Sequence, residues 1–308
     1  MPETIVVLGA GGFIGQHLVR ALALGGQPVV AVGRHRIDSG LPHVEHVGLA
    51  LREPSDFLPL LANARAVVHL ASASTPGSTA GQPLAELENN LRPTLALLQA
   101  LQSHPGCQLL YVSSGGTLYG DTLDTAAHEL HPARPKSYYG AGKAAAEDFI
   151  DAWCNQYAAA ATILRPSNVY GPGQTERRGF GIIPCAMGRM LRQETLTVWG
   201  DGSAERDYLY IDDFVALCTT ILATRMAGGA HALNAASGID TSLNTLFDQL
   251  EAATGQRLLR TYSPNRSVDI ARIALDPALA LRTHGWSAAT PLLEGLQRTW
   301  AWFSTIQH

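Results

Sequence analysis

Tyr139 and Lys143 are the residues of this sequence whose types and spacing most clearly predict chemistry. They lie four positions apart in the segment SYYGAGK, residues 137–143, so on a helix they share one face. A phenol with a pKa of about 10 is a poor base at neutral pH, and an ammonium one turn away lowers that pKa. The pair therefore predicts Tyr139 as a proton acceptor activated by Lys143. Tyr138 has a glycine at the same offset and cannot take this part.

The use of basic residues supports a specific role for position 143. Of the 22 lysines and arginines in the chain, only Lys136 and Lys143 are lysines. The preference for arginine elsewhere does not extend to position 143, which indicates that an ammonium is needed there. A tyrosine and a lysine at this spacing also occur by chance, so the other motifs must decide between the two interpretations.

A glycine-rich segment near the N-terminus predicts a phosphate-binding loop. The segment GAGGFIG, residues 9–15, follows an apolar run at residues 5–8 and leads into a helical pattern. Its glycines permit a tight turn and close packing of helix on strand, and the helix N-terminus offers free N–H groups to a pyrophosphate. An ordinary turn is the alternative. We expect dinucleotide contacts from Gly9, Gly12, Phe13, Ile14 and Gly15.

The end of the second apolar run indicates which dinucleotide binds. A site for NAD usually has Asp or Glu here, which accepts a hydrogen bond from the ribose 2′-hydroxyl. This chain has Gly33-Arg34-His35-Arg36 instead, and guanidinium groups suit a 2′-phosphate. We therefore expect an NAD(P) cofactor with a preference for NADP, bound by Arg34 with Arg36. Two solvated loop arginines are the alternative.

Apolar runs alternate with helical patterns along the first half of the chain. This alternation predicts an α/β fold with a doubly wound parallel sheet of the Rossmann type. We expect strands at residues 5–8, 29–32, 67–70, 109–112 and 162–164, and helices at 14–24, 56–61, 84–102 and 141–158. After residue 165, prolines and glycines predict a looped lobe with one further strand at 232–236 and a last helix at 292–303.

The same pattern predicts two domains. We assign residues 1–166 with about 206–238 to a dinucleotide-binding domain. A smaller C-terminal substrate-binding lobe takes residues 167–205 with about 239–308.

Composition excludes several classes of protein. With 46% hydrophobic and 16% charged residues, the 308-residue chain can form a large core. A net charge of −4 gives no general attraction to nucleic acid or an anionic membrane, and no apolar run approaches the ~18 residues of a membrane span. The four cysteines have no C-x-x-C spacing, so we expect reduced thiols and no metal. We expect a soluble, cytoplasmic protein.

Further motifs follow in order along the chain: VVHLA at 67–71, NNL at 89–91, YVSSGGTLYG at 111–120, LRPSNVYGP at 164–172, GDGSAERDY at 200–208, RSVD at 266–269, GW at 285–286 and PLLEGL at 291–296. With the glycine loop and the Tyr139–Lys143 pair, they make the chain resemble the extended short-chain dehydrogenases. Within these it most resembles the NDP-sugar epimerase/dehydratase family, which includes the UDP-galactose 4-epimerases. The resemblance covers nearly the whole chain.

The resemblance implies roles for individual residues. Tyr139 is implied as the base, and Lys143 as the residue that orients the nicotinamide ribose. Further cofactor contacts are implied for Leu70, Ala71 and Asn90.

For the substrate, the resemblance implies that Arg206 and Arg266 clamp the pyrophosphate of a nucleotide sugar and that Asn168 donates a hydrogen bond to it. Ion pairs of the two arginines with Asp207 and Asp269, and a turn role for Asn168, are the alternatives. The resemblance also implies a homodimer formed through the helices near 84–102 and 141–158.

One departure from the family pattern affects the catalytic centre. Gly115 stands where the family usually has the Ser or Thr that binds the reacting hydroxyl. We therefore assign that hydrogen bond to Ser114 or Thr117.

The segment also bears on the reaction. Dehydratases and decarboxylases of this type need an additional acid near the catalytic Thr, and Gly116 and Thr117 provide none. We therefore expect 4-epimerisation of a UDP-hexose through a transient 4-keto intermediate. An NADPH-dependent 4-keto-sugar reductase and a non-catalytic NADP(H)-sensing protein are the alternatives.

Overall fold

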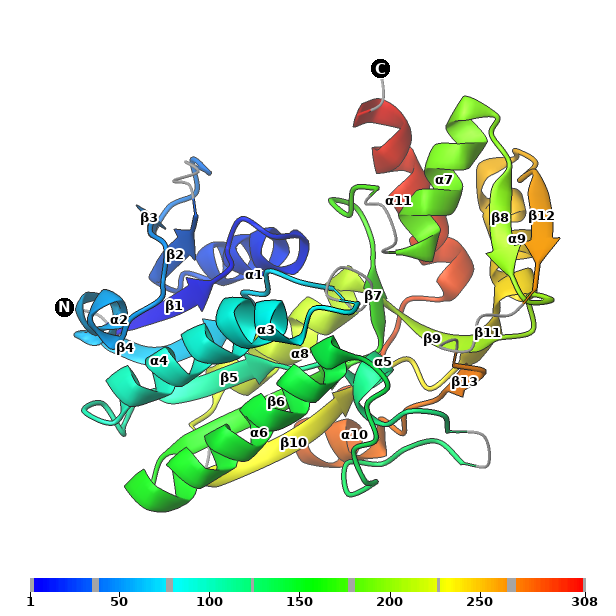
Figure 1. Cartoon of the computed structure of the whole chain (residues 1–308). Helices are drawn as coiled ribbons and strands as arrows, with labels where there is room; N and C mark the ends of the chain where they lie inside the picture. Colours follow the sequence, from blue (N-terminus) through cyan, green and yellow to red (C-terminus); the bar gives the residue numbers. More distant parts are fainter. Residues whose placement is uncertain are drawn as a thin grey trace. The chain divides into compact units, whose positions relative to one another are not determined.

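The computed structural model describes residues 3–34, 39–75, 80–122, 125–176, 181–225, 228–264 and 270–306. The chain divides into two compact units. The first unit comprises Met1–Ser114, Ser137–Arg165 and Val215–Leu233, and the second comprises Gly115–Lys136, Pro166–Phe214 and Asn234–His308. Figure 1 shows the elements of both units along the chain.

A seven-stranded sheet forms the centre of the first unit (Figure 1). Its order is β3 (Val44–Gly48), β2 (Val29–Gly33), β1 (Thr4–Leu8), β4 (Ala64–His69), β5 (Gln108–Val112), β6 (Ala160–Pro166) and β10 (Gly229–Ala235). Neighbours from β3 to β6 pair in parallel, so the predicted doubly wound fold is confirmed. The order reverses beside β1, because β2 lies on one side and β4 on the other. In such sheets, ligands bind at the carboxyl ends of the strands next to this reversal.

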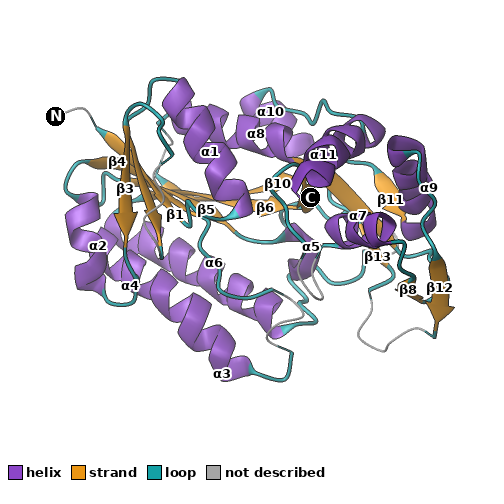
Figure 2. Cartoon of the chain, turned by 90° about the horizontal axis from the view of Figure 1, so that it is seen from above, coloured by secondary structure: helices purple, strands orange, loops and turns teal. Residues whose placement is uncertain are grey.

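Helices cover both faces of this sheet, as Figure 2 shows. Helix α1 (Phe13–Leu24) lies on one face, and α2 (Pro54–Leu61), α4 (Arg92–Leu101) and α6 (Tyr138–Tyr157) lie on the other. Residues 5–8 of β1 are at most 1% exposed, as expected for a strand that is buried on both faces. Helix α8 (Ile211–Ala223) begins in the second unit and continues into the first.

The single helix expected over residues 84–102 is divided into three parts. A short α3 (Pro83–Glu86) is followed by a π-helical turn, η1 (Leu87–Leu91), and then by α4. Pro93 lies in the first turn of α4 and has no amide hydrogen, so the helical bond to the residue four positions earlier cannot form there. Single π turns of this kind often occur at functional sites. This turn contains Asn90.

The second unit contains more regular structure than the looped lobe that the sequence predicted. Strand β9 (Glu205–Tyr210) pairs with β7 (Asn168–Tyr170), β11 (Asp240–Ser242) and β13 (Arg272–Ile273), and β8 (Leu196–Trp199) pairs with β12 (Arg260–Ser263). Its helices include α5 (Gly115–Leu118), α7 (Ile182–Arg192), α9 (Leu243–Thr254), α10 (Ala278–His284) and α11 (Leu292–Ile306). The prolines after residue 165 predicted loops, but one of them, Pro184, occupies the first turn of α7, where proline is tolerated.

Within the described residues, no helix is both long and apolar enough to cross a membrane. All four cysteines are free thiols. No cluster of three or more metal-ligating side chains occurs in the part of the chain that the structure describes.

Candidate active site

The glycine loop packs directly against the end of β4. Gly9 has a φ of +89°, and a Cβ atom built on it would lie 2.8 Å from the backbone nitrogen of Ala71. A Cβ on Gly15 would lie 2.2 Å from the carbonyl oxygen of Gly9. Both positions therefore require glycine, and the packing brings Leu70 and Ala71 beside the loop.

The start of α1 is open for an anion. Gly12 precedes the helix and its nitrogen donates to the Gly9 carbonyl over 3.0 Å, while Phe13 and Ile14 form the first helical residues. The first amides of a helix have no partner within it and present a positive dipole end to a phosphate. The structure thus brings together the loop residues that the sequence singled out, in a form that suits a dinucleotide pyrophosphate.

Tyr139 and Lys143 lie on successive turns at the start of α6. The helix is capped by Ser137, whose hydroxyl accepts from the Gly140 amide over 3.1 Å. The Lys143 side chain is buried, and its Nζ donates to the carbonyl oxygen of Val112 over 2.8 Å. Nζ lies 5.8 Å from the centre of the Tyr139 ring. The predicted shared face is therefore confirmed.

Burial governs the protonation of this pair. It raises the pKa of Tyr139 to about 12, with a further rise from the Glu86 charge, whereas hydrogen bonds from Ser114 and Ser72 lower it. The net shift of the Tyr139 pKa in this structure is therefore upward, whereas the spacing from Lys143 predicted a downward one. Desolvation of the buried hydroxyl is the largest cause of the rise. Burial also lowers the pKa of Lys143 to about 8, against the opposing charges of Glu86 and Glu147.

Of the two candidates, Ser114 acts on Tyr139, since it lowers the pKa of the phenol. Thr117 lies in α5 of the second unit, and its buried Oγ1 has no hydrogen-bond partner among the described residues. The sequence did not point to Ser72, which also lowers the pKa of Tyr139. It belongs to the loop after β4, and no spacing pattern distinguishes it from the serine and threonine residues around it.

Asn90, in the π turn η1, is hydrogen-bonded to the loop after β4. Its Oδ1 accepts from the Ala73 amide over 2.8 Å and from the Ser72 hydroxyl over 3.3 Å. Its Nδ2 donates to Ser74 over 2.6 Å and to Glu86 over 2.9 Å. The side chain predicted to bind cofactor therefore holds the loop that carries Ser72.

Arg34 is exposed directly after β2. Nearby, a cavity of about 330 Å³ is lined by residues of the glycine loop, α1, β2 and β3, among them Gly11, Arg20, Gly33 and His46. Arg36 lies outside the described residues.

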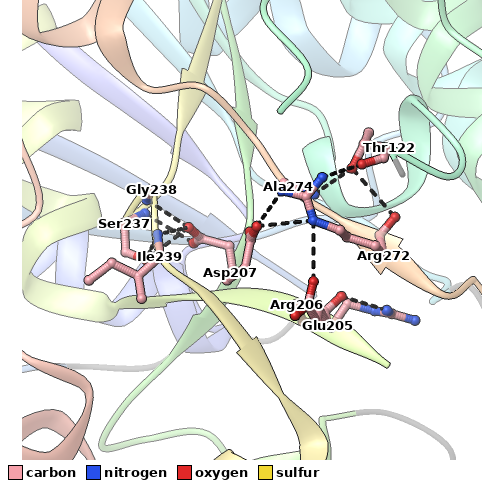
Figure 3. Close-up of polar contacts among 10 residues, drawn as sticks. Thr122, Glu205, Arg206, Asp207, Ser237, Gly238, Ile239, Arg272 and Ala274 are labelled. Carbon is pink, nitrogen blue, oxygen red and sulfur yellow. Dashed lines mark hydrogen bonds and ion pairs between the residues drawn. The ribbon is translucent and has the colours of Figure 1, made fainter. Parts of the chain in front are cut away.

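In the second unit, Arg206 is held by backbone carbonyls (Figure 3). Its guanidinium donates to the carbonyl oxygens of Glu205 and Ile270, each over 2.7 Å. Ile270 directly follows the segment with Arg266, which lies outside the described residues. Nearby, Asn168 donates from Nδ2 to the Asp207 carbonyl over 2.8 Å.

The Asp207 carboxylate contacts the turn after β10 and not the Arg206 side chain (Figure 3). It accepts from the amides of Ser237 and Gly238 over 3.0 Å and 2.7 Å, and from the Ser237 hydroxyl over 2.8 Å. Successive residues of a strand point to opposite faces, so this carboxylate stabilises the turn after β10 and not the Arg206 side chain. Burial raises the pKa of Asp207, and these hydrogen bonds oppose that rise.

Residues 5–236 match the model of the NAD dependent epimerase/dehydratase family. The chain belongs to this family. A UDP-glucose 4-epimerase of Mycolicibacterium smegmatis is 30% identical over 97% of each chain. A putative UDP-glucose 4-epimerase of Methanocaldococcus jannaschii is 28% identical over 97% of each chain.

Solved structures of family members agree with this assignment. A UDP-glucose 4-epimerase of Thermotoga maritima, solved with UDP-glucose, superposes with a TM-score of 0.91 at 27% identity, covering 99% of this chain and 100% of that one. A UDP-glucose 4-epimerase of Thermus thermophilus, in complex with NAD, gives 0.88 at 26% identity and covers 98% and 99%. The family and the fold that the sequence predicted are therefore confirmed.

Proposed function

We propose that this protein is an NAD(P)-dependent 4-epimerase of a UDP-hexose, acting through a transient 4-keto sugar. The observation that supports this most directly is the Tyr139 ring, whose centre lies 5.8 Å from Nζ of the buried Lys143, one helical turn away. The relatives named as UDP-glucose 4-epimerases favour this reaction over a reductase or a non-catalytic sensing protein.

The first unit fits an NAD(P) cofactor on structural grounds. The glycine loop at residues 9–15 has no room for a side chain at Gly9 or Gly15, and it leads directly into the N-terminus of α1. We assign pyrophosphate contacts to residues 9–15, and the nicotinamide ribose to Lys143. A bound nicotinamide supplies the acceptor for the C4 hydride and, when oxidised, a positive charge near the phenol.

The chain's own residues move the proton. Tyr139 takes the proton of the sugar 4-hydroxyl, while the Lys143 ammonium and the hydroxyls of Ser114 and Ser72 stabilise the phenolate. After the 4-keto sugar has turned over, Tyr139 returns the proton to the new 4-hydroxyl, so no net proton is consumed. In the second unit, we assign the substrate diphosphate to Arg206, Arg266 and Asn168.

Proton NMR tests this function. The purified protein is incubated in turn with UDP-glucose, UDP-N-acetylglucosamine and UDP-glucuronate, with catalytic NAD and NADP and no other reductant. We expect one of them to give its C4 epimer without net reduction of cofactor. A protein that converts none of them, but reduces a UDP-4-keto sugar with NADPH, would contradict the proposal.

The end of β2 supports a proposal about which dinucleotide is preferred. We propose that NADP binds better than NAD, with Arg34 beside the 2′-phosphate. Arg34→Ala is then expected to weaken NADP binding by about 10- to 150-fold, because a charge-assisted bond is worth about 1.5–3 kcal/mol, and to leave NAD binding nearly unchanged. Isothermal titration of both dinucleotides measures this. Arg282→Ala, on α10 of the second unit, is the control. Equal losses for NAD and NADP would contradict the assignment.

We also propose a homodimer formed through η1, α3 and α6 of the first unit. Leu84 is 73% exposed, Leu87 42% and Phe149 49%, so both helical segments present apolar side chains to their surroundings. Phe149→Arg is expected to convert a dimer into a monomer, as measured by light scattering after gel filtration. Leu24→Arg, at the end of α1 on the other face of the sheet, should stay dimeric. A wild-type protein that is monomeric at micromolar concentration would contradict the dimer.

A further inference from the structure

Glu86 is a buried acid close to the catalytic pair. It is 3% exposed and ends α3. Its Oε2 accepts from the Ser74 hydroxyl over 2.6 Å, and its Oε1 accepts from Asn90 over 2.9 Å. Burying a carboxylate is costly unless its position serves a purpose that hydrogen bonds and nearby charge sustain.

The carboxylate also packs against the catalytic helix. A Cβ atom built on Gly142 would lie 2.9 Å from both Cγ and Oε1 of Glu86. Gly142 directly precedes Lys143 and follows Tyr139 by three positions, so Glu86 touches the helical turn that connects the base with its lysine. Only glycine leaves room for this approach, which a side chain at position 142 would block.

A chain of hydrogen bonds runs from Glu86 to Ser72, which lowers the pKa of the Tyr139 hydroxyl. Ser74 and Asn90 bond to Glu86 and to each other, and Asn90 accepts from the Ser72 hydroxyl. Ser72 in turn acts on the Tyr139 hydroxyl by favouring its charged form. The loop after β4 is therefore held between the carboxylate and the base.

We propose that Glu86 is a positioning residue of this centre: its carboxylate holds the 72–74 loop against the Gly142 turn, between Tyr139 and Lys143 on α6. Its catalytic consequence rests on the proposed epimerase function, whereas its effect on Lys143 does not.

Among the anions near Lys143, Glu86 has the largest stabilising effect on the lysine ammonium. The titratable groups facing this lysine are Glu86 on α3, Glu147 and Tyr139 on α6, His69 on β4 and Tyr111 on β5. Glu147 is paired with Arg165 over 2.5 Å, which offsets its charge. Burial holds His69 neutral, since it lowers the pKa of that imidazole to about 3. Burial likewise raises the pKa of Tyr111, so this phenol carries no charge.

The direction of the effect follows from charge. Burial lowers the pKa of Lys143 to about 8, and Glu86 opposes this by favouring the ammonium. Glu86→Gln removes that support, so we expect the pKa of Lys143 to fall below 8. The same change removes a charge that raises the pKa of Tyr139. Both limbs of the pH profile of kcat/KM should therefore move to lower pH by about 0.5 unit or more.

The first test does not depend on activity. The chain has two lysines, so protein labelled with ¹³C-lysine gives two side-chain signals, which Lys136→Arg assigns. We expect the Lys143 signal to titrate near pH 8 in the wild-type protein and at least about 0.5 unit lower in Glu86→Gln. Lys136, which pairs with Asp121 in the second unit, should not change. An unchanged Lys143 midpoint would overturn the proposal whether or not the protein is an epimerase.

The second test uses catalysis. Glu86→Gln should shift the pH profile, whereas Glu88→Gln, a matched change at an exposed residue that pairs with Arg92, should not. Ser74→Ala keeps the charge and removes one support of the loop, so it should lower kcat several-fold without moving the pH midpoints. Ser74→Ala also tests the positioning role if the Glu86→Gln protein does not fold. A Ser74→Ala enzyme with wild-type kcat, or a Glu86→Gln enzyme that loses thermal stability with an unshifted profile, would overturn the positioning role.

Discussion

Replacing Tyr139 by phenylalanine is expected to lower kcat of epimerisation by about 10²–10⁴-fold. The change removes the hydroxyl that takes the sugar proton, and it leaves the aromatic ring on α6 in place beside Lys143. Dinucleotide affinity should stay within about twofold, because the cradle at residues 9–15 is untouched. Steady-state kinetics with the preferred UDP-sugar and isothermal titration of the dinucleotide measure the two effects separately.

The chain provides a closely matched control for this variant. Tyr138→Phe removes the same group from the preceding residue, whose side chain is 46% exposed. It should retain near wild-type kcat. Full activity of Tyr139→Phe, or an equal loss in both variants, would contradict the role of Tyr139 as the base.

Gly15→Ala should abolish tight dinucleotide binding. The added Cβ would lie 2.2 Å from the Gly9 carbonyl oxygen, and backbone atoms cannot swing away as a flexible side chain can. Helix α1 must then move off the loop, so the amides at its start no longer meet the pyrophosphate. We expect dinucleotide affinity to fall at least about 10-fold and the free energy of unfolding to fall by about 1–3 kcal/mol.

Gly106→Ala is the control, because a Cβ at that position would meet nothing within 4 Å. It should leave both cofactor affinity and the denaturation midpoint unchanged. A Gly15→Ala protein that binds the dinucleotide as tightly as the wild type would show that the cofactor does not use this loop.

The sequence predicts the first unit well because its buried strands are apolar on both faces. The strand β3 is the exception. In this edge strand, Glu45 and His46 separate Val44 from Val47, and all five residues are partly or fully exposed, so they leave no continuous apolar run. The π turn at η1 was also missed, since only the position of Pro93 distinguishes it from a continuous helix.

In the second unit, several strands are too short to show a periodic pattern of apolar residues. Strand β7 has three residues and β13 two, and they become strands through pairing with β9 rather than through a local pattern. Proline in a sequence favours a loop, but Pro184 fits the first turn of a helix.

The catalytic centre shows the same limit. The spacing of Tyr139 and Lys143 along one helix is a local pattern and was predicted. Ser72 and Glu86 reach Tyr139 from a loop and a separate helix, and only the tertiary arrangement brings them there. The pKa of Tyr139 was misjudged for a related reason, because burial depends on packing that the sequence does not display.

The most direct test of the proposed reaction follows the hydrogen at C4. Protein in ordinary water is given UDP-glucose carrying deuterium at C4, with catalytic NAD(P), and the product is analysed by NMR and mass spectrometry. If hydride leaves C4 and returns to the other face of the same carbon, UDP-galactose forms with the deuterium retained, and no reduced cofactor accumulates. UDP-galactose that has exchanged its C4 deuterium for solvent hydrogen, or a stoichiometric build-up of reduced cofactor without the epimer, would contradict the mechanism.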